Sequence, residues 1–429
     1  MARLAQFKQD ALTARIAGLS FVREGWIGRA RSEALKRLTT MGLPHGRDEY
    51  WRYTRPDRLN EPEAPRATPF DASDEPAFFE TVDRVKLVFT DGVFDAKASD
   101  NPSLAGIEID RLQDAGHRDI HWAQGLYGVL ESQGQSPVER PFAVLNTAFA
   151  SDGILIRVTK DVKKPVAIIY NHESDSSDVI LHHCIKLEEG ADFTFLESGT
   201  AGARFNAVLE VDVADGAKFH HVRAQGRDHE RHEITHIFAR IGADALFKSF
   251  TLTANGRLTR NEAVIDLTGR DSIAHIAGAA MGDDDFAQDD TVFITHGAEH
   301  CESRQVYKKV LKGTAKGVFQ GKILVRKGAQ KTDGYQISQA LLLDDRSQFL
   351  AKPELEIYAD DVACSHGSTS GAIDETALFY LQSRGIPRRK AQSLLVQAFL
   401  SETIDEIDDP AIAQDILGRL ESWVVRHDR

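Results

Sequence analysis

The sequence predicts a mainly β protein whose solenoid core lies between an N-terminal helical region and a C-terminal helical domain. In residues 207–214, alternate apolar side chains share one face while Glu210 and Asp212 lie on the other, which is the period-two pattern of a half-buried strand. A constant spacing of turn glycines between such strands is expected when each coil returns to stack on the previous one. The intervals here are 26, 26, 27 and 28 residues, at Gly190, Gly216, Gly242, Gly269 and Gly297.

The predicted solenoid core spans residues 151–360. Phe319, Ile323 and Val325 again share one face, with Lys322 on the opposite face, so the strand pattern continues far along the chain. Asn255-Gly256 is typical of an antiparallel hairpin, and we therefore expect some coils to be irregular.

Residues 1–150 are predicted to be mostly helical. Ala, Leu, Arg and Glu dominate the first 60 positions, and Gly42-Leu43-Pro44 is a helix stop. Residues 61–76 contain four of the 13 prolines, which indicates an exposed linker. Beyond the linker we expect one strand and two short helices, at 84–89, 119–133 and 139–150.

Residues 361–429 are predicted to form the C-terminal helical domain. Asp374 can cap a helix over 375–384, and Pro387 and Pro410 can each open another. The apolar stripes of these helices are expected to pack on one another, and the docking of a partner is the alternative.

Composition limits the classes of function. The chain has 429 residues, with 52 Lys and Arg against 65 Asp and Glu, so its formal net charge is −13. This balance argues against a general nucleic-acid or anionic-membrane binder. The hydrophobic fraction of 42% and the charged fraction of 27% are typical of a globular chain.

Only three cysteines are present, at Cys184, Cys301 and Cys364. They form no CxxC pair, so the sequence predicts neither a zinc ribbon nor a disulfide framework. A four-thiolate iron–sulfur or zinc site cannot be built from this chain by itself.

No run of residues approaches the roughly 18 to 20 apolar positions of a membrane-spanning helix. Arg3, Lys8, Asp10 and Arg15 interrupt the first 18 residues, which therefore lack the apolar region of a signal peptide. We expect a cytoplasmic protein in a reducing compartment, with no membrane and no nucleic-acid partner.

The motif His232-Glu233-Ile234-Thr235-His236 matches the zinc-peptidase pattern H-E-x-x-H. That pattern needs a helix, but residues 235–241 alternate like a strand and lie between two of the turn glycines. On a strand, side chains four residues apart lie about 13 Å from each other and cannot share one ion. The sequence therefore argues against a metallopeptidase.

The sequence lacks nucleotide-binding motifs and gives only a weak indication of a second metal site. No P-loop and no GxGxxG motif is present, so any ATP hydrolysis would be carried out by another chain. Histidine pairs and cysteines could form a soft-ligand patch, although satisfied core or surface histidines are the commoner outcome. The residues concerned are His182, His183, Cys184, His220, His221, His296, His300 and Cys301.

The pair Cys364 and His366 stands apart because the two residues are separated by one position. On an extended chain they project to the same side, about 6.5 to 7 Å apart, which suits a site completed by a facing surface. Thiolate and imidazole together favour zinc or an iron–sulfur cluster. A buried structural cysteine beside a turn histidine is the alternative.

The run 353–386, PELEIYADDVACSHGSTSGAIDETALFYLQSRGI, closely resembles the C-terminal signature of the SufB/SufD family, the scaffold subunits of the SUF iron–sulfur cluster assembly system. Residues 42–44, 49–54 and 318–343 match as well, so the resemblance covers most of the chain. The Cys-Ser-His-Gly motif is typical of the SufD branch, whereas SufB members usually lack it here and are longer.

The resemblance implies a right-handed parallel β-helix that pairs with SufB, and C-terminal helices that bind the ATPase SufC. Shared β-helix edges would also allow a homodimer when SufB is absent. In the family, the histidine at the position of His366 is proposed to matter for the nascent cluster at the SufB interface, and Cys364 belongs to the same motif. Both are therefore candidate cofactor-binding and metal-ligating residues. We expect no cofactor to be held stably by this chain alone, and a transient iron–sulfur cluster at the interface.

Three kinds of function remain in competition. The sequence favours a non-catalytic scaffold of the SufBCD complex, with a SufB-like cluster scaffold as the near alternative. A secreted-type β-helix carbohydrate-active enzyme would need clustered carboxylates on exposed strand faces. The zinc hydrolase is the third possibility, and the strand context of its motif argues against it.

Overall fold

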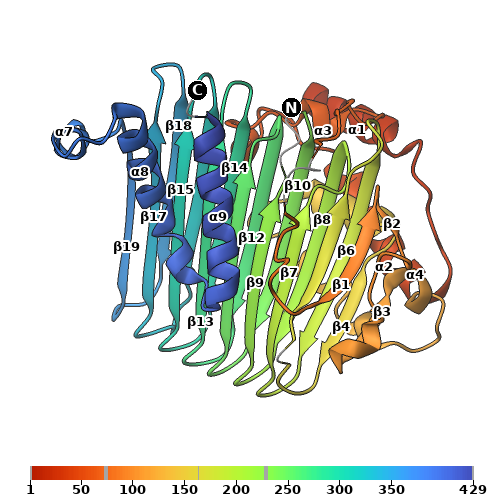
Figure 1. Cartoon of the computed structure of the whole chain (residues 1–429). Helices are drawn as coiled ribbons and strands as arrows, with labels where there is room; N and C mark the ends of the chain where they lie inside the picture. The colour runs from red at the N-terminus through yellow and green to blue at the C-terminus, as the bar shows by residue number, and fades with distance from the viewer. Residues whose placement is uncertain (1, 72–75, 163, 227–229, 428–429) are drawn as a thin grey trace.

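The computed structural model describes residues 2–71, 76–162, 164–226 and 230–427 and contains two long parallel sheets that face each other (Figure 1). We call the ten-stranded sheet, of order β19-β17-β15-β13-β11-β9-β7-β5-β1-β2, sheet A. Its strands are β1 Val85–Thr90, β2 Val93–Phe94, β5 Val166–Asn171, β7 Asp192–Gly199, β9 Lys218–Gln225, β11 Leu246–Ala254, β13 Ile273–Gly282, β15 Glu302–Leu311, β17 Asp333–Leu342 and β19 Ala363–Gly371.

The nine-stranded sheet, of order β18-β16-β14-β12-β10-β8-β6-β4-β3, is sheet B. Its strands are β3 Glu108–Arg111, β4 Ile154–Val158, β6 Asp178–Leu187, β8 Arg204–Val213, β10 His232–Ile241, β12 Leu258–Leu267, β14 Ala287–His296, β16 Lys316–Val325 and β18 Gln348–Ile357.

Successive strands from β4 onward alternate between the two sheets, and each strand pairs with the strand two positions along the chain. These pairings are parallel, and the only antiparallel ladders among the described strands are β1–β2 and β3–β4. The prediction of a mainly β fold with a parallel β-helix core is confirmed.

The predicted hairpin at Asn255-Gly256 is wrong. Both residues have positive φ, +56° and +113°, as the signal requires, but the turn carries the chain from β11 in sheet A to β12 in sheet B. The local conformation was therefore predictable, whereas the partner of each strand is set by stacking on the previous coil.

The evenly spaced glycines all lie in turns that lead from a sheet B strand to the next sheet A strand. At Gly269 a Cβ atom would lie 1.9 Å from the backbone nitrogen of Ala243, and at Gly242 it would lie 2.4 Å from Asp215 Oδ1. At these two positions consecutive turns stack too closely for a side chain, whereas Gly190 and Gly216 have positive φ, +71° and +67°, which favours glycine.

The space between the sheets is an apolar core. Ala207, Leu209, Val211 and Val213 of β8 are buried in it, as their alternation predicts. Aromatic rings from neighbouring coils stack beside them, among them Phe193, Phe219 and Phe247. Each Å² of apolar surface removed from water contributes about 25 cal/mol to the free energy of folding. This core is therefore the main source of the stability of the fold.

The N-terminal region packs against the outer face of sheet B through a second apolar cluster. The helices predicted within 119–133 and 139–150 are present. The described part of the predicted linker contains no helix or strand, and residues 72–75 lie outside the described residues. The helices are α1 Ala2–Ile16, α2 Gly25–Met41, η1 Glu49–Trp51, α3 Asp57–Asn60, η2 Pro102–Ala105, α4 Leu112–Ala115, η3 Trp122–Gly125, α5 Val129–Gln133 and α6 Pro141–Phe149.

The C-terminal helices α7 Glu375–Ser383, α8 Arg388–Ser401 and α9 Pro410–His427 follow β19, with η4 Ile404–Glu406 between the last two. The Asp374 side chain accepts hydrogen bonds from the Thr376 and Ala377 nitrogens, as the predicted cap requires. Helices α8 and α9 lie on the outer face of sheet A and share an apolar cluster with it (Figure 1). Because β19 extends to Gly371, the helices begin later than residue 361.

None of the helices in the described ranges is both long and apolar enough to cross a membrane.

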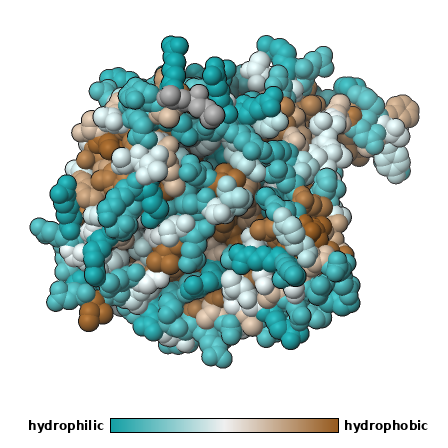
Figure 2. Space-filling view, turned by 180° about the vertical axis from the view of Figure 1, so that it is seen from behind, coloured by the Kyte–Doolittle hydropathy of each residue, from teal (hydrophilic) through white to brown (hydrophobic). Residues whose placement is uncertain are grey.

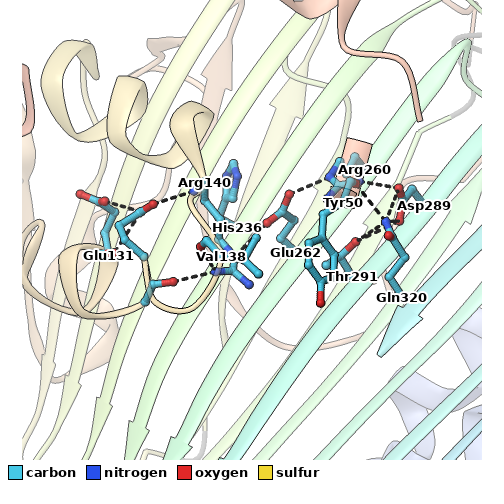
Figure 3. A network of polar contacts seen from close by, with 12 residues as sticks. Tyr50, Glu131, Val138, Arg140, His236, Arg260, Glu262, Asp289, Thr291 and Gln320 are labelled. Carbon is cyan, nitrogen blue, oxygen red and sulfur yellow. Dashed lines mark hydrogen bonds and ion pairs between the residues drawn. The ribbon is translucent and has the colours of Figure 1, made fainter. Parts of the chain in front are cut away.

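A buried polar network fastens the N-terminal region to sheet B (Figure 3). The Arg260 side chain donates to Glu262 at 2.6 Å, to the Tyr50 carbonyl at 3.0 Å and to Asp289 at 2.5 Å. Its guanidinium also stacks over the Trp51 ring at 4.2 Å. Burial opposes ionisation of Glu262, but the nearby arginines outweigh it and hold its pKa at about 2.

We expect Arg260→Ala to lower the free energy of unfolding by about 3–5 kcal/mol, because it leaves the buried Asp289 carboxylate without its ion-pair partner and Glu262 with Arg140 alone. Denaturant unfolding followed by tryptophan fluorescence measures this. The matched control is Arg326→Ala, whose half-exposed pair with Asp266 spans 3.4 Å and should contribute less than about 1 kcal/mol. Equal losses in the two variants would contradict a clamping role for Arg260.

Candidate functional site

The candidate site lies at the end of the β-helix formed by the last strand of each sheet. Strands β18 and β19 each pair on one side only, with β16 and β17 respectively. At the opposite end, β2 and β3 turn back as antiparallel strands. The β18/β19 end therefore presents a free backbone edge in both sheets (Figure 1).

Strand β19 places Cys364 and His366 on one face, as the sequence predicts. Cys364 packs with Ile323 and Leu355 of sheet B, so this face is turned toward the space between the sheets. Gly334, its neighbour in β17, would bring a Cβ atom within 3.2 Å of the Cys364 sulfur. The end of the core thus carries one thiol and one imidazole that face inward from an edge strand.

The two side chains differ in exposure. Cys364 is half-buried, and burial raises the pKa of its thiol. His366 is exposed and makes no hydrogen bond or ion pair with the described residues. Its imidazole is free to meet a ligand or a partner that approaches the open end.

Sequence reasoning missed two glutamines directly behind His366. Gln336 of β17 pairs in register with His366, and Gln305 of β15 pairs with Gln336. Both are fully buried, and neither amide oxygen nor amide nitrogen has a hydrogen-bond partner among the described residues. The three positions are 31 and 30 residues apart, close to one coil, so the repeat length could have identified them.

Gly321 of the opposite strand β16 leaves room for the Gln336 side chain. A Cβ atom at this glycine would lie 2.4 Å from the Gln336 amide oxygen. Burying four polar atoms without hydrogen-bond partners costs folding free energy. Such atoms in a native structure call for an explanation, and a ligand-binding site is one. The polar row therefore extends the candidate site inward from His366.

The H-E-x-x-H motif lies on strand β10, as predicted. Ile234 and Phe238 belong to the cluster under the N-terminal helices, so His232 and His236 share that outer face. Glu233 faces the interior, where it accepts a hydrogen bond from Gln225 at 2.8 Å. The three side chains cannot converge on one ion.

The predicted soft-ligand patch does not form as one site. His221 bonds Glu197 at 2.8 Å inside the core, and His296 bonds Ser303 at 2.8 Å further along. The Cys301 thiol lies 3.3 Å from the Gly269 carbonyl. In the described part of the chain, two groups of three could hold a metal ion, namely His182, Cys184 and Glu210, and Glu108, Asp110 and His121.

This architecture defines a class of protein, a parallel β-helix with helical layers on both outer faces and one uncapped end. Residues 169–399 match the family described as the SufBD core domain of SUF-system FeS cluster assembly, and residues 23–168 match the SufBD N-terminal region. The chain belongs to the SufBD family.

Relatives of known name agree with this assignment. The iron–sulfur cluster assembly protein SufD of Escherichia coli (strain K12) is 30% identical over 394 residues, which is 90% of each chain. An iron–sulfur cluster assembly SufBD family protein of Mycobacterium tuberculosis is 27% identical over 88% of this chain and 89% of its own. SufD of Bacillus subtilis is 27% identical over 67% of both.

We expect Cys364 to react slowly with iodoacetamide at neutral pH, because the raised pKa keeps the thiol protonated. Its rate should rise with pH through and beyond the usual thiol range of about 8.5. Mass spectrometry of the native protein measures this, with Cys364→Ser as the control that loses the label. A rate that reaches its plateau below that range would contradict the description of Cys364.

Proposed function

We propose that this chain is a SufD-type, non-catalytic scaffold subunit that supplies one wall of a shared iron–sulfur assembly site. The observation that carries the proposal is the inward-facing pair of Cys364 and His366 on the free edge strand β19. The names of the relatives, two of which are SufD proteins, support the same role.

The cluster is the cargo of this site. A [2Fe–2S] or [4Fe–4S] cluster takes four protein ligands in the common cases, and this end of the β-helix offers one thiol and one imidazole. The remaining ligands therefore come from a second chain, and no cluster is held stably by this subunit alone. A reducing cytoplasm suits a site with a free thiol.

The second chain is a SufB-type β-helix. Free edges of β18 and β19 invite strand addition, and a related β-helix presents a matching edge with the same strand spacing. Pairing in this way continues both sheets across the interface and brings the partner's ligands next to His366. A second copy of this chain could occupy the same edge when SufB is absent.

The C-terminal helices are the proposed contact for the ATPase SufC. Helix α7 projects beyond β19 in Figure 1 and forms the lobe at the upper right of Figure 2. It exposes Phe379 and Tyr380 by 71% and 55%, although its Leu378 is buried. Exposed aromatic side chains on a projecting helix are typical of a docking surface.

We expect His366→Ala to form a normal complex with SufB and SufC homologues after co-expression and anaerobic purification, while lowering cluster assembly about tenfold or more. A strain that depends on this pathway gives the second readout, growth. His117→Ala, an exposed histidine of the N-terminal region, is the matched control and should change neither.

Two results would contradict the scaffold proposal. One is a normal rate of cluster assembly by the His366→Ala variant, because it would show that the proposed assembly site at His366 is not used. The other is a wild-type chain that forms no complex and shows hydrolase activity by itself, which favours an enzyme.

We expect Phe379→Ser to weaken binding of the SufC homologue about tenfold, because it removes a large exposed aromatic contact without touching the core. Titration calorimetry with the purified full chain measures the Kd. Ile120→Ser, which alters a residue that is 87% exposed in the N-terminal region, is the control and should leave the Kd unchanged. Equal Kd values for Phe379→Ser and the wild type would place the SufC contact elsewhere.

A further inference from the structure

A second set of ligating side chains lies far from β19, between sheet B and the N-terminal helices. His182 and Cys184 stand on the same face of β6, and Glu210 stands beside them on β8. Each residue contributes one donor atom, and the three atoms all lie within 4.8 Å of one another. All three side chains are fully buried, so the cluster is shielded from water.

The histidine is oriented as a metal ligand would be. Its Nδ1 faces the side-chain oxygen Oδ1 of Asn146 at 3.0 Å, and its Nε2 faces Glu210 at 2.8 Å. The Asn146 amide nitrogen donates to the carbonyls of Leu181 and Asn206, both at 2.9 Å, which fixes its oxygen toward the ring. A ligating histidine commonly donates its second N–H to such an oxygen.

The carboxylate of Glu210 is held just as firmly. It accepts hydrogen bonds from the backbone nitrogens of Gly128 at 2.5 Å and Glu131 at 2.8 Å, at the start of α5. These bonds fix its position but leave Oε2 directed at His182 and 4.0 Å from the Cys184 sulfur. The outer shell of a metal site is therefore already built.

We propose that His182, Cys184 and Glu210 bind one borderline divalent ion, with Zn²⁺ as the best match to this donor set. Thiolate, carboxylate and neutral imidazole are the zinc ligands of proteins, and a zinc site with three protein donors takes one water as its fourth ligand. A thiolate and a carboxylate together carry two negative charges, which a divalent ion balances in a site closed to bulk water.

Without an ion, Nε2 of His182 and Oε2 of Glu210 share one hydrogen bond of 2.8 Å. With an ion, the proton between His182 and Glu210 and the proton of the Cys184 thiol are released to solvent. Normal bond lengths of about 2.0 Å to nitrogen and oxygen and 2.3 Å to sulfur place the donors roughly 3.3–3.5 Å apart. The present spacings of 2.8 and 4.0 Å bracket that range.

The proposed ion would have a structural role, because it would join β6 and β8 to the α5 segment. It would bind while the chain folds, since the folded protein closes the site. The site is separate from the Cys364/His366 end, so it does not depend on the proposed scaffold function.

The test is the metal content of the full chain, expressed with added zinc and purified without chelator. We expect about one zinc ion per chain in the wild type. Cys184→Ser and Glu210→Gln should lower the content about tenfold or more. Cys301→Ser, which alters the other buried cysteine, and His117→Ala, which alters an exposed histidine, should both retain the ion.

A cobalt-substituted wild-type chain provides the readout that needs no variant. A thiolate-to-cobalt charge-transfer band and an X-ray absorption shell with one sulfur are expected. The proposal is overturned if folded wild-type chain contains no zinc, if Cys184→Ser retains it at the wild-type level, or if the cobalt spectrum shows no sulfur ligand.

Discussion

The in-register parallel pairing of successive coils is the constraint on which the rest of the structure depends. Each strand from β4 onward takes its partner from the coil before it, so side chains at equivalent positions form straight rows along both sheets. The rows on the inner faces fill an apolar core that runs through most of the coils, with a separate apolar cluster at the β18/β19 end. Because every coil packs on the previous one, the stack could continue at either end. The backbone edge of the first and last coils must therefore be capped or paired.

Helices cover the two outer faces of the β-helix, whereas its two ends differ from each other. The helices pack on these faces through separate apolar clusters, and the buried Arg260 side chain, which donates to the Tyr50 carbonyl, fixes the N-terminal layer to sheet B. The β1–β3 end folds back on itself, whereas β18 and β19 keep a free edge with inward-facing Cys364 and His366. This asymmetry is what converts a stable solenoid into a candidate subunit of a larger assembly.

Much of the fold could be predicted because two independent patterns in the sequence indicate the repeating coils. One is the alternation of apolar residues in strands such as 207–214, and the other is the spacing of the turn glycines. The Asn255-Gly256 turn shows the limit, since a dipeptide encodes φ and ψ but not which strand will be the neighbour. Cys364 and His366 were found because they lie two residues apart. Gln336 and Glu210 were missed because their relation to His366 and His182 depends on register between coils, which short motifs do not contain.

The most direct test of the shared-site account is hydrogen–deuterium exchange of this chain with and without a SufB homologue. Free edge amides exchange rapidly, and strand addition protects them. The account predicts new protection concentrated in β18 and β19, with the β1–β3 end unchanged. Binding that protects the β1–β3 end or the outer helices, and leaves β18 and β19 as they are in the free chain, would contradict it.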